Sequence, residues 1–166
     1  MAIGLADLFK QIAAGIYVIG VAHEDRRNAF TAAWIMQVSF TPPLLALSIN
    51  PHQASYPLLT AGRIFSVNVL RRGQIALAWH FGTRSVRDFD KLAGIPWRLG
   101  LTGAPILADS LAFFDCQLVQ SLRTGDHELV IGQVLDGAMV TPDAAPMTYA
   151  ETGDLDGSSK LYPSGL

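Results

Sequence analysis

The 166-residue sequence has little cysteine and little charge. Its single cysteine, Cys116, excludes an internal disulfide and a metal site made of several thiolates. This residue lies in an apolar run, 113–118, so we expect a buried and inert thiol. Charged residues make up only 16% of the chain and the net charge is -2. This balance disfavours a partner bound through its phosphates, such as a nucleic acid.

The sequence also lacks long hydrophobic runs. No uninterrupted apolar segment reaches the length of a transmembrane helix. A signal peptide has a basic region followed by an apolar one, and residues 1–10 lack this pattern. We therefore expect a cytoplasmic protein with no membrane partner. Half of the residues are nonetheless hydrophobic, and this high share indicates a subunit interface that hides additional apolar surface.

Several motifs of known chemistry are missing. Gly15 and Gly20 have the spacing of the first half of a P-loop, but no Gly-Lys pair follows them. No G-x-G-x-x-G sequence follows an expected strand, and no cluster of Cys and His could hold a metal. Ser110 has no nucleophile-elbow context. The sequence therefore gives no support to a classical dinucleotide fold, a metal centre or a serine hydrolase.

Expected strands predominate over expected helices. Apolar and β-rich runs predict strands over 16–22, 44–49, 64–70, 111–123 and 127–135, the last two joined by a hairpin turn at 124–126. Short helices are expected over 5–12, 54–61, 74–81 and 85–92, and loops over 94–105 and from 141 onward. The pattern predicts one domain over 1–166. It is a mostly β, closed or partly closed antiparallel barrel with short helical insertions. The C-terminal arm, about 141–166, would cover a partner or form a mobile tail.

One stretch, 28–68, combines apolar segments with small hydroxyl and amide residues. Ala32 and Ala33 are small enough to let the backbone approach a flat ring, and Trp34 offers a large plane beside them. Ser55 precedes an expected helix, where a phosphate can meet free backbone N–H groups. Taken singly, Trp34 can be a core residue and Ser55 an N-cap. Together they predict a site for a flat aromatic ligand with a polar tail.

The order of these segments resembles the flavin reductase-like family, whose fold is the FMN-binding split β-barrel. The matching segments are 28–50, with Thr-x-x-Trp from Thr31 and Ser-x-x-Pro-Pro from Ser39, then 63–70, and then 125–134, which begins with Gly-Asp-His. The resemblance spans about residues 8–140. It implies a homodimer that holds FMN, or alternatively FAD, near the subunit boundary. The implied activity is reduction of the flavin by NAD(P)H, with reduced flavin passed to a partner monooxygenase or redox protein.

The resemblance also implies a set of site residues. These are Thr31, Ala32, Ala33, Trp34 and Val38 by the flavin ring, Ser48, Ile49 and Asn50 by the ribityl chain, Ser55 and Tyr56 by the phosphate, and His127 near the nicotinamide. A purely structural role for His127, in the turn at Asp126, is an equal alternative. Many family members carry a basic residue beside the phosphate, where this chain has Pro-His-Gln-Ala at 51–54. Phosphate binding therefore depends on Arg63, Arg84 or a residue of the arm supplying the charge.

Two other functions stay open at this point. The first is an FMN-containing electron-transfer protein, similar to flavoredoxin, that a protein partner reduces without nicotinamide. The second is a flavin-binding module with no turnover. Hydride chemistry belongs to the cofactors and needs no strong acid or base from the protein, so the missing catalytic motifs do not separate these functions.

Overall fold

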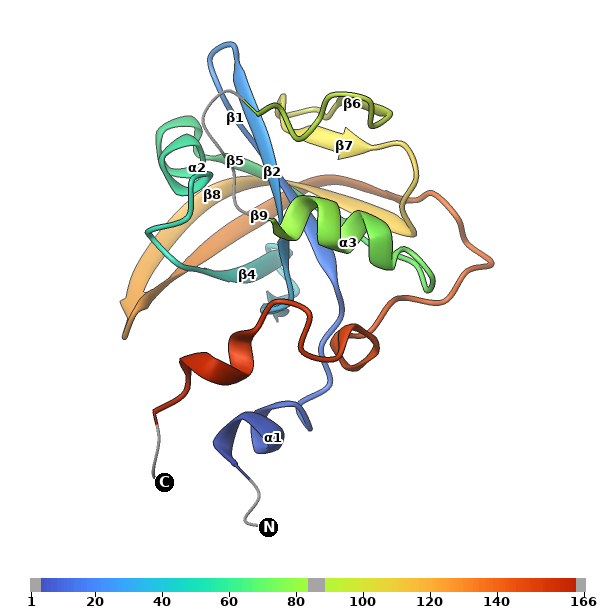
Figure 1. Ribbon diagram of the computed structural model, residues 1–166. Coiled ribbons are helices and arrows are strands. Elements are labelled where there is room, and N and C mark those ends of the chain that lie inside the picture. The colour runs from blue at the N-terminus through green and yellow to red at the C-terminus, as the bar shows by residue number, and fades with distance from the viewer. Residues whose placement is uncertain (1–3, 84–88, 164–166) are drawn as a thin grey trace.

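The computed structural model describes residues 4–83 and 89–163 (Figure 1). Its strands are β1 (Tyr17–His23), β2 (Arg26–Ala32), β3 (Ile35–Ser39), β4 (Leu44–Ile49), β5 (Ile64–Val69), β6 (Trp97–Leu99), β7 (Pro105–Leu107), β8 (Ala112–Thr124) and β9 (His127–Met139). Its helices are α1 (Leu5–Phe9), α2 (Tyr56–Gly62) and α3 (Ile75–Gly82), with 3-10 turns η1 (Tyr149–Thr152) and η2 (Ser158–Leu161). Among these residues, no helix is long and apolar enough to cross a membrane.

Seven strands form one sheet in the order β2-β1-β5-β8-β9-β4-β3, with every pair antiparallel. The two strands at the ends of this order, β2 and β3, are consecutive in the chain and are separated only by Ala33 and Trp34. The backbone N–H of Ser48 donates to the carbonyl of Trp34 at 3.0 Å. The chain therefore passes from one edge of the sheet to the other at this dipeptide and closes a split barrel there. The predicted mostly β, antiparallel barrel is confirmed.

The barrel interior is filled by alternate side chains of its strands. The buried cluster includes Ile19, Leu47, Phe65, Val67 and Val130, each at most 1% exposed. Cys116 is also buried in this cluster, as predicted, and burial raises the pKa of its thiol to about 12. The thiol is therefore held in its neutral, unreactive form at physiological pH.

A second apolar cluster lies outside the barrel, between β1 and α3. Val18, Phe81 and Met147 are buried in it. The Thr31 hydroxyl donates to the carbonyl of Ala78 at 2.6 Å and so ties the end of β2 to α3. This contact fixes the backbone just before the dipeptide where the barrel closes.

Some local predictions differ from the structure. Strands β2 and β3 were not among the predicted strands, and the loop expected over 94–105 contains β6 and the start of β7. The helix expected over 54–61 is α2, whose C-cap is Arg63, in the left-handed region with φ 54°. Half of the helix expected over 85–92, residues 85–88, lies outside the described residues, and 89–92 are not helical.

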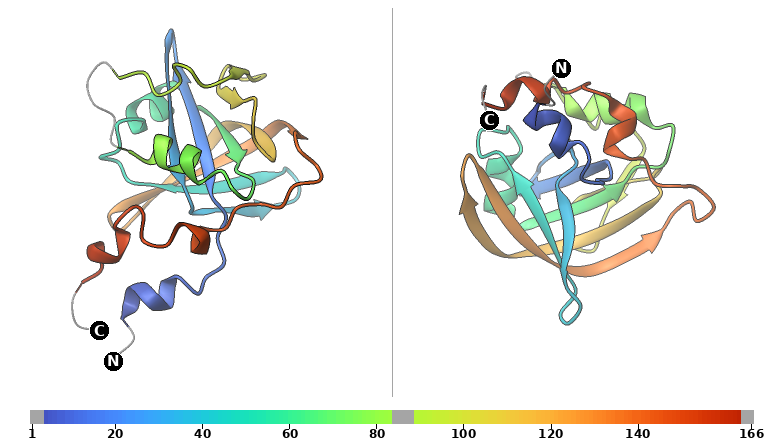
Figure 2. Two further views of the ribbon diagram at one scale, coloured as in Figure 1. Left: turned by 45° about the vertical axis from the view of Figure 1, so that its right-hand side comes forward. Right: turned by 90° about the horizontal axis from the view of Figure 1, so that it is seen from below.

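The C-terminal arm folds back onto its own chain. Gly15 and Thr148 form an antiparallel bridge, and the N–H of Tyr149 donates to the carbonyl of Ala14 at 2.8 Å. Both views in Figure 2 show α1 and the C-terminal turns side by side, on one side of the barrel. The two ends of the chain therefore form one structural unit beside the sheet.

Candidate functional site

A cavity of about 630 Å³ opens beside the dipeptide where the barrel closes. Eight of the residues named from the sequence line it: Thr31, Ala32, Ala33, Trp34, Ser48, Ile49, Asn50 and His127. They come from the end of β2, the end of β4 and the start of β9. β4 and β9 are paired antiparallel, with Ile49 opposite Glu128, so the register places Asn50 and His127 at the same end of the sheet. The sheet closure thus brings segments that are distant in sequence onto one surface.

The other three residues named from the sequence are not part of this wall. Val38 lies on β3 and is 40% exposed, whereas Ser55 is 1% exposed at the start of α2. The Tyr56 hydroxyl donates to Oε2 of Glu128 at 2.5 Å, which raises the pKa of Tyr56 and lowers that of Glu128. A ligand contact for these three residues stays a prediction.

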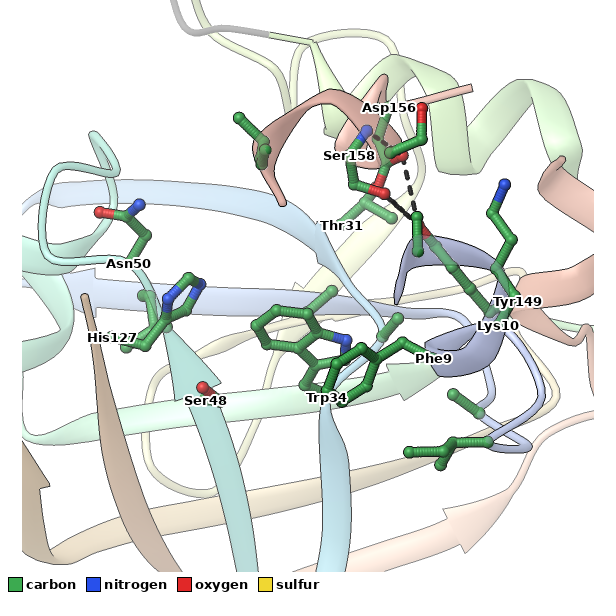
Figure 3. Close-up of a pocket in the computed structure, with 18 of the residues that line it drawn as sticks. Phe9, Lys10, Thr31, Trp34, Ser48, Asn50, His127, Tyr149, Asp156 and Ser158 are labelled. Atoms are coloured by element: carbon green, nitrogen blue, oxygen red, sulfur yellow. Dashed lines mark hydrogen bonds between the residues drawn. The ribbon is translucent and has the colours of Figure 1, made fainter. Parts of the chain in front are cut away.

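Trp34 and His127 form the aromatic part of the cavity wall. Their ring centroids are 5.0 Å apart with an interplanar angle of 46°, and Trp34 remains 52% exposed. A large aromatic side chain with half of its surface open to solvent is available to stack on a planar ligand. Figure 3 shows Ser48, Asn50 and His127 at one end of the cavity, with Trp34 and Thr31 between them and the chain termini.

The His127 ring is held by the preceding carboxylate. Nδ1 of His127 lies 2.8 Å from Oδ1 of Asp126, and the hydrogen bond lowers the pKa of Asp126. A carboxylate can only accept, so Nδ1 carries the proton in the neutral ring and Nε2 is left as an acceptor. The contact with Asp126 fits the turn role that the sequence left as one alternative, and the functional role of His127 stays a prediction.

A second, more polar cavity of about 450 Å³ adjoins the first and shares Asn50 and Gln53 with it. Lys91 lines this second cavity and is only 3% exposed. Its amine donates to the carbonyls of Phe81, at 3.0 Å, and Thr83, at 2.5 Å. Burial lowers the pKa of this amine. Within the described residues, no carboxylate lies within ion-pair distance of it.

Lys91 was missed by the sequence analysis, which named Arg63, Arg84 or the arm as sources of positive charge. Arg63 donates to the carbonyl of Leu118 at 3.0 Å and lines neither cavity, and Arg84 lies outside the described residues. A lysine at 91, in a short polar stretch after α3, gives no sequence signal of burial. Only the packing of 89–92 against the end of α3 places its amine at the second cavity.

A further wall of the first cavity, which was not predicted from the sequence, comes from the chain termini. It consists of Ala6, Phe9, Lys10, Ile12 and Ala14 from the N-terminal segment, and Tyr149, Asp156, Ser158, Ser159, Leu161 and Tyr162 from the C-terminal arm. The sequence contained one indication of this wall, because the apolar stripe of the first helix needs a packing partner. In the structure, no residue of α1 is buried.

The side chains around the two cavities fit the parts of FMN. Ala32, Ala33 and Trp34 offer a flat apolar surface for a ring, and the Ser48 hydroxyl and Asn50 amide match a polyhydroxyl chain. Oδ1 of the Asn50 side chain accepts from the backbone N–H of His52 at 2.9 Å, which orients the side chain. Lys91, which has carbonyl acceptors but no carboxylate partner among the described residues, lines the adjoining cavity and matches a phosphate. The described residues contain no cluster of His, Cys, Asp and Glu that could hold a metal ion.

Comparisons with known proteins agree with this geometry. Residues 9–156 match the family described as flavin reductase like domain. The chain is 38% identical over 138 residues to the high molecular weight rubredoxin of Moorella thermoacetica, covering 82% of this chain and 60% of that protein. It is 33% identical over 125 residues to FMN reductase (NADH) RutF of Variovorax paradoxus, covering 75% of this chain and 69% of that protein.

Among solved structures, the NADH:FAD oxidoreductase SgcE6 of Streptomyces globisporus superposes with a TM-score of 0.81 at 28% identity. The match covers 87% of this chain and 86% of that one. An FMN-binding protein from Thermus thermophilus superposes with a TM-score of 0.73 at 34% identity, covering 78% of this chain and 73% of that one. The fold, the position of the cavity and the match over 9–156 together lead to one conclusion: this chain belongs to the flavin reductase like family.

Proposed function

We propose that this chain binds FMN at the closure point of the barrel and reduces it with NADH or NADPH. The observation that carries the proposal is the continuity of the two cavities. An apolar wall at Ala32, Ala33 and Trp34 leads through Asn50 to the second cavity, which Lys91 lines. FMN has the same order of parts, from ring to ribityl chain to phosphate. Relatives named FMN reductase (NADH) and NADH:FAD oxidoreductase support the same activity.

Each residue then has a defined task. Thr31, Ala32, Ala33 and Trp34 hold the ring, Ser48, Ile49 and Asn50 hold the ribityl chain, and Lys91 neutralises the phosphate. When bound, the flavin supplies the hydride acceptor of the reaction. Nε2 of His127 accepts a hydrogen bond from the carboxamide of the nicotinamide and orients that ring. Trp34 and the apolar wall exclude water from the space between the two rings.

Anaerobic mixing of the FMN-loaded protein with NADH, and separately with NADPH, tests this function. The visible flavin absorbance is expected to be lost after mixing with at least one of these two nucleotides.

The second candidate function is electron transfer from a protein donor, which is favoured by the 38% identity to a protein named high molecular weight rubredoxin. Bleaching by a reduced rubredoxin and by neither nicotinamide would establish the carrier and contradict the reductase.

A homodimer completes the proposed site. The end strand β3 has an unpaired edge, and its surface exposes Met36 (63%), Val38 (40%) and Phe40 in the following turn (88%). These side chains extend the exposed apolar surface that begins with Trp34 at the cavity. A second copy packed on them would remove apolar area from water, at about 25 cal/mol per Å², and would place the cavity near the subunit boundary.

Sedimentation at micromolar concentration is expected to give twice the chain mass. Phe40→Asp is expected to shift the protein toward the monomer, because the new charge would be buried in the interface. Leu101→Asp is the matched control, since Leu101 is 72% exposed and lies away from β3. A monomeric wild-type protein would contradict the dimer, and a Phe40→Asp dimer as stable as the control would contradict this interface.

A further inference from the structure

The two ends of the chain form a compact unit that we call the terminal lobe, comprising residues 4–12 and 148–162. Phe9 and Tyr162 stack with ring centroids 5.4 Å apart and an interplanar angle of 22°. The Tyr149 hydroxyl lies 2.7 Å from Oγ of Ser158 and 3.0 Å from Oδ2 of Asp156. These contacts fasten η2 to η1 and to α1. The lobe therefore presents a built surface to the cavity.

This surface lies beyond the part of the cavity that the proposed FMN site uses. Figure 3 shows Phe9, Lys10, Tyr149 and Asp156 at the end of the cavity opposite Asn50. A flavin whose ribityl chain leaves toward Asn50 and Lys91 leaves the lobe end free for a second ligand. The lobe offers that ligand an aromatic pair, a carboxylate and the hydroxyls of Ser158 and Ser159.

Part of the lobe lies beyond the family match. The family match covers residues 9–156, whereas Ser158, Ser159, Leu161 and Tyr162 also line the cavity and lie after that match. Their contribution to the wall therefore does not follow from family membership. It follows from the fold of this arm, which the Phe9–Tyr162 stack holds beside the barrel.

The charges of the lobe favour one kind of ligand. Its described residues carry four carboxylates, Asp7, Glu151, Asp154 and Asp156, and two amines, Lys10 and Lys160. Asp156 and Lys10 line the cavity. Asp154 is engaged by the N–H of Ser159 at 3.1 Å and by its hydroxyl at 2.5 Å. An aromatic ring recognises an aromatic base, a carboxylate recognises a ribose with free hydroxyls, and an amine recognises a pyrophosphate.

We infer that the terminal lobe binds the adenosine half of the nicotinamide dinucleotide and that Asp156 selects a free ribose 2′-hydroxyl, so that the chain uses NADH in preference to NADPH. This inference rests on the proposed reductase function. The adenine stacks on the Phe9–Tyr162 pair, and the Asp156 carboxylate accepts from the ribose hydroxyl. A 2′-phosphate brings like charge to the same carboxylate and is repelled.

The first test uses ADP-ribose, which lacks the nicotinamide and cannot react. Calorimetric titration of the FMN-loaded wild-type protein is expected to show binding, and Phe9→Ala is expected to weaken it about 10-fold, because base–aromatic stacking is lost. Leu8→Ala is the matched control on the same helix, since Leu8 is 55% exposed and does not line the cavity. No binding of ADP-ribose to the wild-type protein, or equal weakening by both variants, overturns the inference.

The second test compares NADH with reduced nicotinamide mononucleotide, which lacks the adenosine half. Phe9→Ala is expected to raise KM for NADH about 10-fold, because it removes the same stacking. It is expected to leave both KM for the mononucleotide and kcat unchanged. Equal changes for both donors would mean that the lobe acts on the flavin or on folding, which overturns the inference. If ADP-ribose binds as expected but no nicotinamide bleaches the flavin, the proposed reductase function fails and the adenosine site stands.

The third test addresses the choice between the two dinucleotides. Asp156→Asn is expected to lower the kcat/KM ratio of NADH over NADPH, whereas Asp154→Asn, which removes a nearby acid that does not line the cavity, is expected to leave the ratio near the wild-type value. The matching binding experiment compares ADP-ribose with its 2′-phosphate. Equal effects of the two variants would show that overall charge sets the preference, and no effect of either would remove Asp156 from the site.

Discussion

Replacing Lys91 with methionine is expected to weaken FMN binding by about 30-fold and to leave riboflavin binding nearly unchanged. Hydrogen bonds to charged groups contribute about 1.5–3 kcal/mol, which corresponds to about 10- to 100-fold in affinity. Lys91 is 3% exposed, and among the described residues its amine has carbonyl acceptors but no carboxylate. A phosphate in the adjoining cavity would supply the missing negative charge. Methionine keeps an unbranched side chain that is one atom shorter, and it removes the amine with its charge and its hydrogen bonds to the carbonyls of Phe81 and Thr83.

Riboflavin serves as the internal control, because it lacks the phosphate but has the same ring and ribityl chain. Lys160→Met is the matched control variant, since Lys160 is exposed and lines neither cavity. Both affinities can be read from fluorescence titrations of the flavin. If Lys91→Met weakens the binding of FMN and of riboflavin equally, the lysine only supports the end of α3 through its hydrogen bonds to the carbonyls of Phe81 and Thr83. An unchanged FMN affinity would remove Lys91 from the phosphate site.

Replacing His127 with alanine is expected to slow NADH-driven bleaching about 10-fold, with FMN affinity nearly unchanged. The loss of one orienting hydrogen bond is worth about 1–2 kcal/mol, and each 1.36 kcal/mol changes a rate about tenfold. The ring stands 5.0 Å from Trp34 and is fixed by Asp126 at 2.8 Å, so its Nε2 is held in one direction. The flavin contacts proposed here come mainly from β2 and β4.

Asp126→Asn probes the same interaction without removing the imidazole. An amide can donate as well as accept, so the ring is no longer restricted to one tautomer, and an intermediate rate is expected. His23→Ala is the control, because His23 lies at the end of β1 and lines neither cavity. If the His127→Ala protein binds FMN and reduces it at the original rate, His127 only completes the turn with Asp126.

Five of the seven barrel strands were predictable because their signals are local, whereas β2 and β3 were not predicted. An apolar run bounded by an Asn-Pro turn predicts β4, and its predicted bounds, 44–49, are those observed. The β8–β9 hairpin follows from two long strand-like runs around Gly125, whose φ of 58° suits a glycine at the turn. These features depend on neighbours in sequence, so periodicity and turn residues identify them.

The site was predictable only in part, because it depends on contacts between distant segments. The residues of the barrel wall follow from the ordered motifs around Thr31, Ser48 and His127. The burial of Lys91 follows instead from the packing of 89–92 on α3, and the terminal lobe follows from the stacking of Phe9 on Tyr162. The burial of Lys91 has no periodic or spacing signal. The apolar stripe of the first helix indicates that Phe9 needs a partner, but no local pattern identifies Tyr162 as that partner.

The most direct test of this account is a titration of the purified protein with FMN, followed by heat release and by tryptophan fluorescence. The account predicts saturation at one FMN per chain, with quenching that is largely lost in Trp34→Phe and retained in Trp97→Phe, because Trp34 lines the large cavity and Trp97 lies on β6. If the addition of FMN causes neither heat release nor quenching, that result contradicts the assignment of the cavity at the barrel closure as a flavin site.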